Sequence, residues 1–108
     1  MRSSEFGIPL DAVFGALADP TRRTMIRRLA DSGPGTATEL ARDLPISRQA
    51  VVKHLQALDA AGLVQAERVG REVRFAATLD TLDDASAWMA DVGAAWDRRL
   101  SRLRRRTR

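Results

Sequence analysis

The stretch TELARDLPISRQAVVKHLQALDAAGLV, residues 38–64, decides the fold predicted for this chain. Its second half has apolar residues at helical spacing, since Val51, Leu55 and Leu58 fall on one side of an α-helix. Long polar side chains fall on the other side: Arg48, Gln49, Lys53 and Gln56. Packing inside the chain does not explain why two amides, an arginine and the only lysine of the sequence share an outward face.

Two helices joined by a tight turn are predicted within this stretch. Thr36 and Glu39 have the spacing of a capping box, which starts a helix over about residues 37–43. The segment PIS follows as a turn, and Ser47 caps a second helix that runs to about residue 60. Gly62 ends it, because glycine readily supplies a left-handed residue after the last helical turn. The pattern predicts a helix-turn-helix.

Two further helices are predicted before the helix-turn-helix. The first contains apolar residues at helical spacing: Leu10, Val13, Phe14 and Leu17. The second begins with Asp19 as N-cap and Pro20 at the first helical position, and it ends near residue 31 at the segment SGPG.

After Gly62 the apolar period changes from helical spacing to two. The runs 63–69 and 72–78 alternate on either side of Gly70 and Arg71, which predicts a β-hairpin. A last long helix, capped by Asp80 or Thr81, is then expected to reach about residue 104. A hairpin directly after a helix-turn-helix is called a wing, so the fold class is mainly α with a β-hairpin, a winged helix-turn-helix in the order α-α-α-α-β-β-α.

A chain of 108 residues is expected to form a single domain, with residues 1–8 as a flexible N-terminal segment and residues 104–108 as a basic tail. The absence of cysteine excludes disulfides and thiolate metal sites. No apolar run approaches the roughly 20 residues that span a bilayer, and the N-terminus lacks the apolar core of a secretory signal. A cytoplasmic protein without a membrane partner is expected.

The net charge of +4 is unevenly distributed along the sequence. Seven of the 18 basic residues lie from Arg98 onward, so residues 1–97 hold 11 basic residues against 14 acidic ones. A nucleic-acid surface on the body of the protein must therefore be a local basic patch. The arginine-rich end has three interpretations: added non-specific affinity for nucleic acid, a site for another partner, or a disordered solubilising tail.

Double-stranded DNA is the partner that the second helix of the helix-turn-helix fits. Arg48 and Lys53 can pair with guanine, Gln49 can pair with adenine, and Val52 can pack on a thymine methyl group. Ser47 at the start of the helix suits a phosphate. The wing adds arginines that alternation can place toward the phosphate backbone: Arg68, Arg71 and Arg74. The competing interpretation is that this polar face is only solvated.

Enzyme activity and metal binding are not expected. His54 is the sole histidine, and one imidazole cannot make a metal site, so a packed or hydrogen-bonded histidine is the better interpretation. No serine has an apparent base partner, and there is no glycine-rich phosphate loop. The five aspartates between residues 80 and 97 are expected to favour the start of the last helix through its dipole, with a hard cation held across a dimer as the alternative.

Three segments together resemble the ArsR-type winged-helix repressors of bacteria and archaea. They are ALADPTRRTMIRRL (residues 16–29), the opening stretch, and ERVGREVRF (residues 67–75). The resemblance covers about residues 10–78. It implies a homodimeric repressor that binds an inverted repeat in a promoter, with DNA contacts from residues 47, 48, 49, 52 and 53 and from Arg71 at the wing tip.

The same resemblance implies a dimer formed mainly by the first and last helices. Apolar residues of these helices are the expected interface: Leu10, Val13, Phe14, Leu17, Trp88, Val92, Trp96 and Leu100. The two tryptophans are also suited to line a site for an aromatic inducer.

The chain departs from the family pattern in ways that affect its expected signal and base preference. Val52 replaces a common serine and Phe75 a common tyrosine, and metal-sensing members have cysteines, or acid and histidine pairs, that this chain lacks. Metal sensing is therefore not expected, and a small-molecule inducer stays an open alternative. A different class of function is a winged-helix module that binds proteins and not specific DNA, which the acidic balance of residues 1–97 favours.

Overall fold

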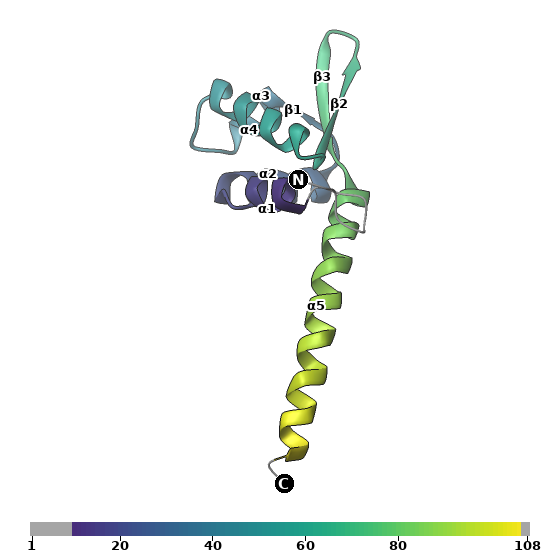
Figure 1. Cartoon of the computed structure of the whole chain (residues 1–108). Helices are drawn as coiled ribbons and strands as arrows, with labels where there is room; N and C mark the ends of the chain where they lie inside the picture. The colour runs from purple at the N-terminus through teal and green to yellow at the C-terminus, as the bar shows by residue number, and fades with distance from the viewer. Residues whose placement is uncertain (1–9, 107–108) are drawn as a thin grey trace.

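The computed structural model describes residues 10–106 (Figure 1). The helices are α1 (Leu10–Leu17), α2 (Pro20–Ser32), α3 (Ala37–Arg42), α4 (Arg48–Ala60) and α5 (Leu79–Arg106). The strands are β1 (Gly35–Thr36), β2 (Val64–Val69) and β3 (Glu72–Ala77). The predicted winged helix-turn-helix is confirmed, and the expectation of a flexible segment at residues 1–8 lies outside the described residues.

The core lies between two layers of helices, with α1 and α2 on one side and α3 and α4 on the other (Figure 1). The predicted inward residues of α4, Val51, Leu55 and Leu58, are completely buried. They meet Met25 of α2 and Leu40 of α3, which are 1% exposed. Each such side chain contributes roughly 1.5–3 kcal/mol by leaving water, so this packing fixes which face of α4 points outward.

The predicted helix caps are present. Thr36 Oγ1 accepts a hydrogen bond from the backbone N–H of Glu39 at 3.1 Å, and the Glu39 carboxylate accepts one from the N–H of Thr36 at 2.8 Å. The Asp19 carboxylate accepts hydrogen bonds from two backbone N–H groups at the start of α2. Gly62, with φ +76°, follows α4 in the left-handed conformation that the sequence predicted.

The sheet contains a strand that sequence reasoning did not predict. Its order is β1-β3-β2, and β1 pairs with β3 through Gly35 opposite Phe75 and Thr36 opposite Arg74. A strand of two residues has no periodicity of its own, so only its tertiary partner reveals it. Because Thr36 also caps α3, this short strand joins the wing directly to the helix-turn-helix.

The last helix differs from its prediction at both ends. It begins at Leu79, so Asp80 and Thr81 lie in its first turn and the prediction that one of them is the N-cap was wrong. It continues to Arg106, so most of the predicted basic tail is helical. With 28 residues it is about 42 Å long, and after the buried Ala85 it projects away from the body (Figure 1). No helix within residues 10–106 is both long enough and apolar enough to cross a membrane.

Acid should weaken the capping box. The hydrogen bond from the Thr36 N–H lowers the pKa of Glu39 most strongly, with partial burial opposing it and Arg74 adding to it. A lowered folded-state pKa stabilises the fold above the ordinary pKa of glutamate, and this contribution is lost as the pH falls through the lowered value. Urea unfolding of Glu39→Gln and wild-type protein should therefore differ at neutral pH and converge in acid. The control is Asp59→Asn, at an exposed residue of α4; an equal pH response in both variants would contradict the assignment.

Candidate nucleic-acid interface

The first two turns of α4 present the polar face that the sequence predicted. Arg48, Gln49 and Lys53 are all exposed, because the packing of Val51 and Leu55 turns them outward. Ser47 is the N-cap, and its Oγ accepts a hydrogen bond from the N–H of Ala50 at 3.1 Å. The other N–H groups of the first turn and the positive end of the helix dipole favour an anion at this end of α4.

Arg48 links the two helices of the helix-turn-helix. Its Nε donates a hydrogen bond to Thr38 Oγ1 of α3 at 3.1 Å. The contact holds the guanidinium at the junction of α3 and α4, and Arg48 as a whole remains exposed. A side chain that is held in place before binding loses less conformational entropy when it contacts a ligand.

A groove of about 550 Å³ lies between α3, α4 and the wing. Its lining residues come from all three elements: Thr36, Ala37, Thr38, Glu39, Arg42, Arg48, Val52, Arg71, Glu72, Val73 and Phe75. Val52 is half-buried and packs against the core, so it borders the groove and is less accessible than the neighbouring polar residues of α4. Its contact with a thymine methyl group stays a prediction.

Arg74 offsets negative charge at this groove, but its side chain does not point toward a DNA backbone, as the sequence had suggested. Its guanidinium lies 3.5 Å from a Glu39 oxygen and 3.4 Å from a Glu72 oxygen, and it donates to the carbonyl of Pro34. The expectation that Arg74 points toward a phosphate backbone was therefore wrong. Arg74 offsets the negative charge of both glutamates that line the groove. The positive charges of Arg42 and Arg48 therefore have a larger effect on the potential in the groove.

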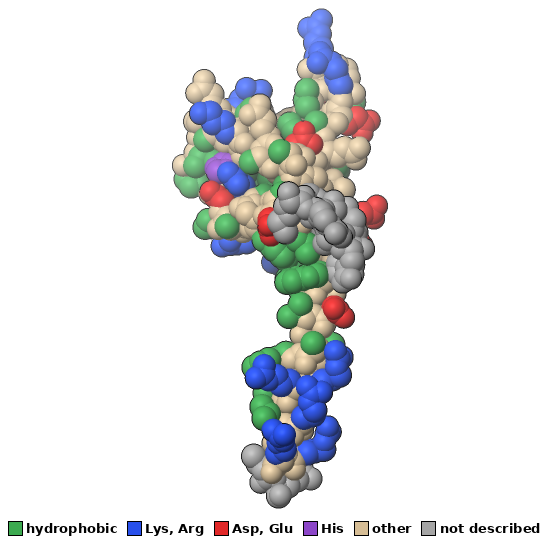
Figure 2. All heavy atoms as spheres, viewed as in Figure 1, with side chains coloured by type: hydrophobic (Ala, Val, Ile, Leu, Met, Phe, Trp, Pro, Cys, Tyr) green, Lys and Arg blue, Asp and Glu red, His purple; other side chains and the backbone are tan. Residues whose placement is uncertain are grey.

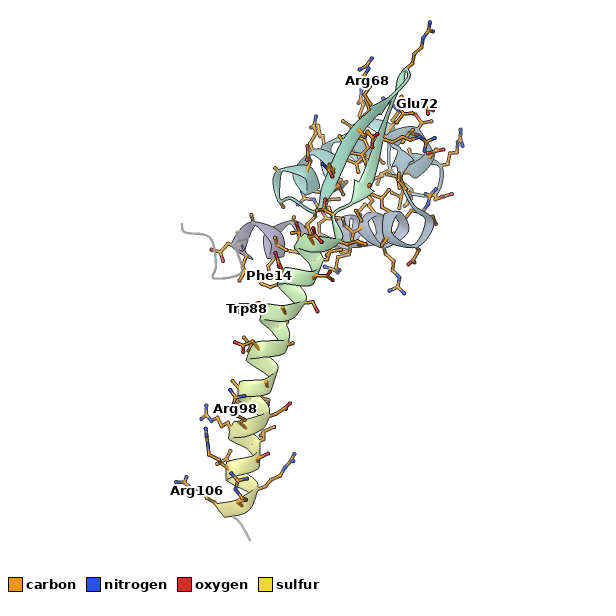
Figure 3. All side chains as sticks on the ribbon, turned by 90° about the vertical axis from the view of Figure 1, so that its right-hand side faces the viewer. Phe14, Arg68, Glu72, Trp88, Arg98 and Arg106 are labelled. Carbon is orange, nitrogen blue, oxygen red and sulfur yellow. The ribbon has the colours of Figure 1, made fainter. Side chains whose placement is uncertain are left out.

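The strand register places the wing arginines on different faces. Arg68 pairs with Val73, whereas Glu67 pairs with Arg74, so Arg68 and Arg74 point to opposite faces of the hairpin. Arg71 lies in the turn after Gly70 (φ +63°) and is exposed. Figure 3 shows Arg68 near the free end of the hairpin, away from α5.

Sequence reasoning missed two residues of this surface, Thr38 and Arg42. Both lie on α3 and are exposed, and both line the groove beside Arg48. Arg42 lies in the last turn of α3, where a basic residue also suits the helix dipole. The signal that can identify it is its position on the first helix of a helix-turn-helix, four residues after Thr38.

His54 has the structural role predicted for it. Its Nδ1 accepts a hydrogen bond from Nε of Arg22 at 3.2 Å. This contact ties α4 to α2. Within residues 10–106, no cluster of three or more histidine, aspartate or glutamate side chains could hold a metal ion.

The apolar residues predicted for a dimer interface have different environments in the single chain. Val13 is 0% exposed in the core, so it has no surface to offer a partner, and its assignment to the interface was wrong. Phe14 and Trp88 pack with their ring centroids 5.7 Å apart, where α1 meets α5 (Figure 3). Further along α5, Val92 and Trp96 are 48% and 55% exposed. Leu10, Leu17 and Leu100 are half-buried.

Comparison with known proteins gives consistent matches. A family model described as a helix-turn-helix domain matches residues 17–65. The HTH-type transcriptional regulator Rv2034 of Mycobacterium tuberculosis is 44% identical over 91 residues, which cover 84% of this chain and 81% of that protein. The transcriptional repressor SdpR of Bacillus subtilis is 31% identical over 80 residues, covering 74% and 88%. The solved structure of an ArsR-like transcriptional regulator from Rhodococcus sp. RHA1 superposes with a TM-score of 0.79 at 43% identity, covering 89% of this chain and 90% of that one.

Removal of a groove arginine should weaken nucleic-acid binding without changing sequence preference. For Arg42→Ala or Arg71→Ala, we expect weaker binding to any duplex, and a slope of log K against log salt that is smaller by about 0.9 per lost phosphate contact. Fluorescence anisotropy at several salt concentrations measures this slope. Arg27→Ala, at an exposed residue of α2, is the control. If the salt slope of these variants equals that of Arg27→Ala, the groove is not part of the DNA-binding surface.

Proposed function

Because this chain belongs to the ArsR-like family of winged helix-turn-helix transcriptional regulators, which bind DNA and are not enzymes, we propose that it is a homodimeric repressor of an inverted-repeat promoter site. The observation that supports a DNA site on α4 is its exposed N-terminal face beside the arginine-lined groove. The relative SdpR is named a transcriptional repressor, which supports repression as the sign of regulation. A promoter-binding protein of this kind acts in the cytoplasm.

Each DNA-contacting residue has a distinct proposed task. Gln49 and Lys53 read base edges in the major groove, since their side chains are exposed on α4 and long enough to reach them. Arg48 joins them from the position fixed by its hydrogen bond to Thr38. Ser47 and the start of α4 bind a phosphate.

The wing has the task of holding the flanking backbone. Arg68 and Arg71 are exposed near its free end, and neither forms an ion pair within residues 10–106. Phosphate contacts set the orientation of α4 on the duplex, whereas base contacts set the sequence preference.

A second copy of the chain is proposed to cover α5. The exposed side chains of Val92 and Trp96, with Leu100 beside them, form an apolar surface that a partner would remove from water. Symmetric dimers of helix-turn-helix proteins place their recognition helices about 34 Å apart, one turn of DNA, and therefore bind inverted repeats. The releasing signal is proposed to be something other than a thiolate-bound metal, since the sequence has no cysteine.

Two substitutions on α4 should reduce specificity more than affinity. Wild-type protein should prefer a duplex from upstream of its own gene over a scrambled duplex by about 10³. Gln49→Ala and Lys53→Ala should each reduce that preference by about 1–3 kcal/mol, because a lost bidentate contact affects only the correct site. Anisotropy titrations with both duplexes at two salt concentrations measure the ratio.

The matched control is Gln65→Ala, which removes an exposed amide from β2 and not from α4. It should leave the preference unchanged. Equal binding of both duplexes by the wild-type protein, lost at high salt, would instead favour a protein-interaction module whose arginines bind polyanions without specificity.

A charge placed on the apolar surface of α5 should dissociate the dimer. Val92→Asp is expected to shift the mass in sedimentation equilibrium toward one chain, since a carboxylate buried without a partner strongly destabilises an interface. Val69→Asp is the matched control, because Val69 lies on the wing and is also 48% exposed. A dimer equally stable in both variants would exclude α5 from the interface.

A further inference from the structure

The C-terminal end of α5 concentrates positive charge that the proposed DNA contacts of α4 and the wing do not use. Residues 98–106 hold six arginines and no acidic residue. All six are exposed, and Figure 2 shows basic side chains gathered at the end of α5 that lies far from the body. This part of the helix therefore offers a strongly basic surface.

Five of these arginines share one side of the helix. At about 100° per residue, they fall within about a third of the circumference, and Arg104 lies outside this arc. They form the arginine face: Arg98, Arg99, Arg102, Arg105 and Arg106. None of the five forms an ion pair within residues 10–106. Arg102 stands four residues from both Arg98 and Arg106, and like charges at this spacing repel each other, so a negatively charged partner would stabilise this end of α5.

The arginine face and the apolar surface of α5 lie on different sides of the helix. Trp96 and Leu100 are about 120° and 160° around the axis from Arg102, which is central in the arginine face. A second chain that covers Trp96 and Leu100, as in the proposed homodimer, leaves Arg98 and Arg102 exposed to solvent. The same cover removes the apolar side chains that a basic helix would need for insertion into a membrane surface.

The arginine face lies at the opposite end of the molecule from the wing. Figure 1 shows the hairpin and the end of α5 pointing in opposite directions, and Figure 3 shows the same for Arg68 on one side and Arg98 and Arg106 on the other. Arg98 is about 20 Å along the helix axis from the buried Ala85, at 1.5 Å per residue. A straight duplex bound by α4 and the wing therefore does not reach the arginine face.

The chemistry of the arginine face suits DNA. Residues 98–106 contain no lysine, and guanidinium groups pair with phosphate oxygens through two parallel hydrogen bonds. The face is about 12 Å long, and a duplex carries about seven phosphate charges over that length. Five arginines on one side of a helix thus meet a comparable density of opposite charge.

Starting from the DNA-bound chain of the proposed function, we propose that the arginine face of α5 binds the phosphate backbone of a second DNA duplex. The start of α4 and the wing hold the promoter site at one end of the protein, and α5 holds another segment of DNA at the other end. The contact with the second duplex uses phosphates alone, so it is independent of sequence and weakens steeply with salt. The protein then bridges two DNA segments.

A bridging assay with the full chain tests the proposal. The upstream duplex is fixed to beads and loaded with protein, and the retention of a fluorescent scrambled duplex per bound chain is measured over a range of salt concentrations. Wild-type protein should retain the second duplex. Arg98→Gln with Arg102→Gln should weaken this retention at least about tenfold at low salt and reduce the slope of log K against log salt by about 1.8, for two lost phosphate contacts.

Two further variants are the controls. Arg27→Glu lowers the net charge by the same two units at an exposed residue of α2, and it should retain the second duplex as wild type does. Arg98→Lys with Arg102→Lys keeps both charges and should keep the wild-type salt slope. Glutamine and lysine both favour helices, and unchanged binding of the upstream duplex shows that the α5 variants fold.

The outcomes separate this inference from the proposed function. Equal retention by wild type and the glutamine variant would overturn it. Specific binding of the upstream duplex without retention of a second one would also overturn it, while the repressor would stand. Wild-type binding to phosphatidylglycerol vesicles, lost in the glutamine variant and without bridging, would assign the arginine face to membranes instead. If scrambled and upstream duplexes load the beads equally, promoter specificity fails, but retention that still depends on Arg98 and Arg102 supports the second DNA site.

Discussion

The burial of Val51, Leu55 and Leu58 against α2 and α3 is the constraint on which the rest of this structure depends. These three side chains fix the rotation of α4 about its own axis, because turning the helix by one residue would expose apolar groups and bury polar ones. The orientation of Gln49 and Lys53 toward solvent is therefore a consequence of core packing. The backbone of α4 is therefore already oriented before any DNA arrives, which reduces the conformational entropy lost on binding.

A second constraint joins the wing to the helix-turn-helix at the Glu39 carboxylate. It accepts the capping hydrogen bond from Thr36 and forms an ion pair with Arg74 of β3. Thr36 itself belongs to β1, which pairs with β3. One carboxylate thus contributes to the start of α3, the position of the wing and the charge of the groove between them. For this reason Arg74, which the sequence suggested as a DNA contact, makes its contacts with other residues of the protein.

The sequence predicted those features that depend on local periodicity and capping. The order of the helices and the hairpin could be predicted, and so could the caps Asp19 and Ser47, because these features follow from residues close in sequence. The hydrogen-bonded role of His54 could be predicted because the sequence offers no other histidine or cysteine to form a metal site with it. The errors have another origin. The burial of Val13 depends on which face of α1 meets α2, and the roles of Arg42 and Arg74 depend on contacts across the groove, which no spacing along the chain contains.

In the proposed homodimer, the exposed length of α5 connects dimerisation to regulation. One α4 helix reads only a few base pairs, and each correct contact contributes about 1–3 kcal/mol, so a single chain discriminates weakly among the many competing sites in a genome. Two chains joined through α5 combine two half-sites, and the second half-site then binds at a high effective concentration. Under this proposal, occupancy of the promoter depends steeply on the strength of the α5 contact. Since the side chains of Val92 and Trp96 are about half exposed in the single chain, a partner supplies most of this contact in the proposed homodimer, and a signal that alters the pairing of α5 would regulate DNA binding without touching α4.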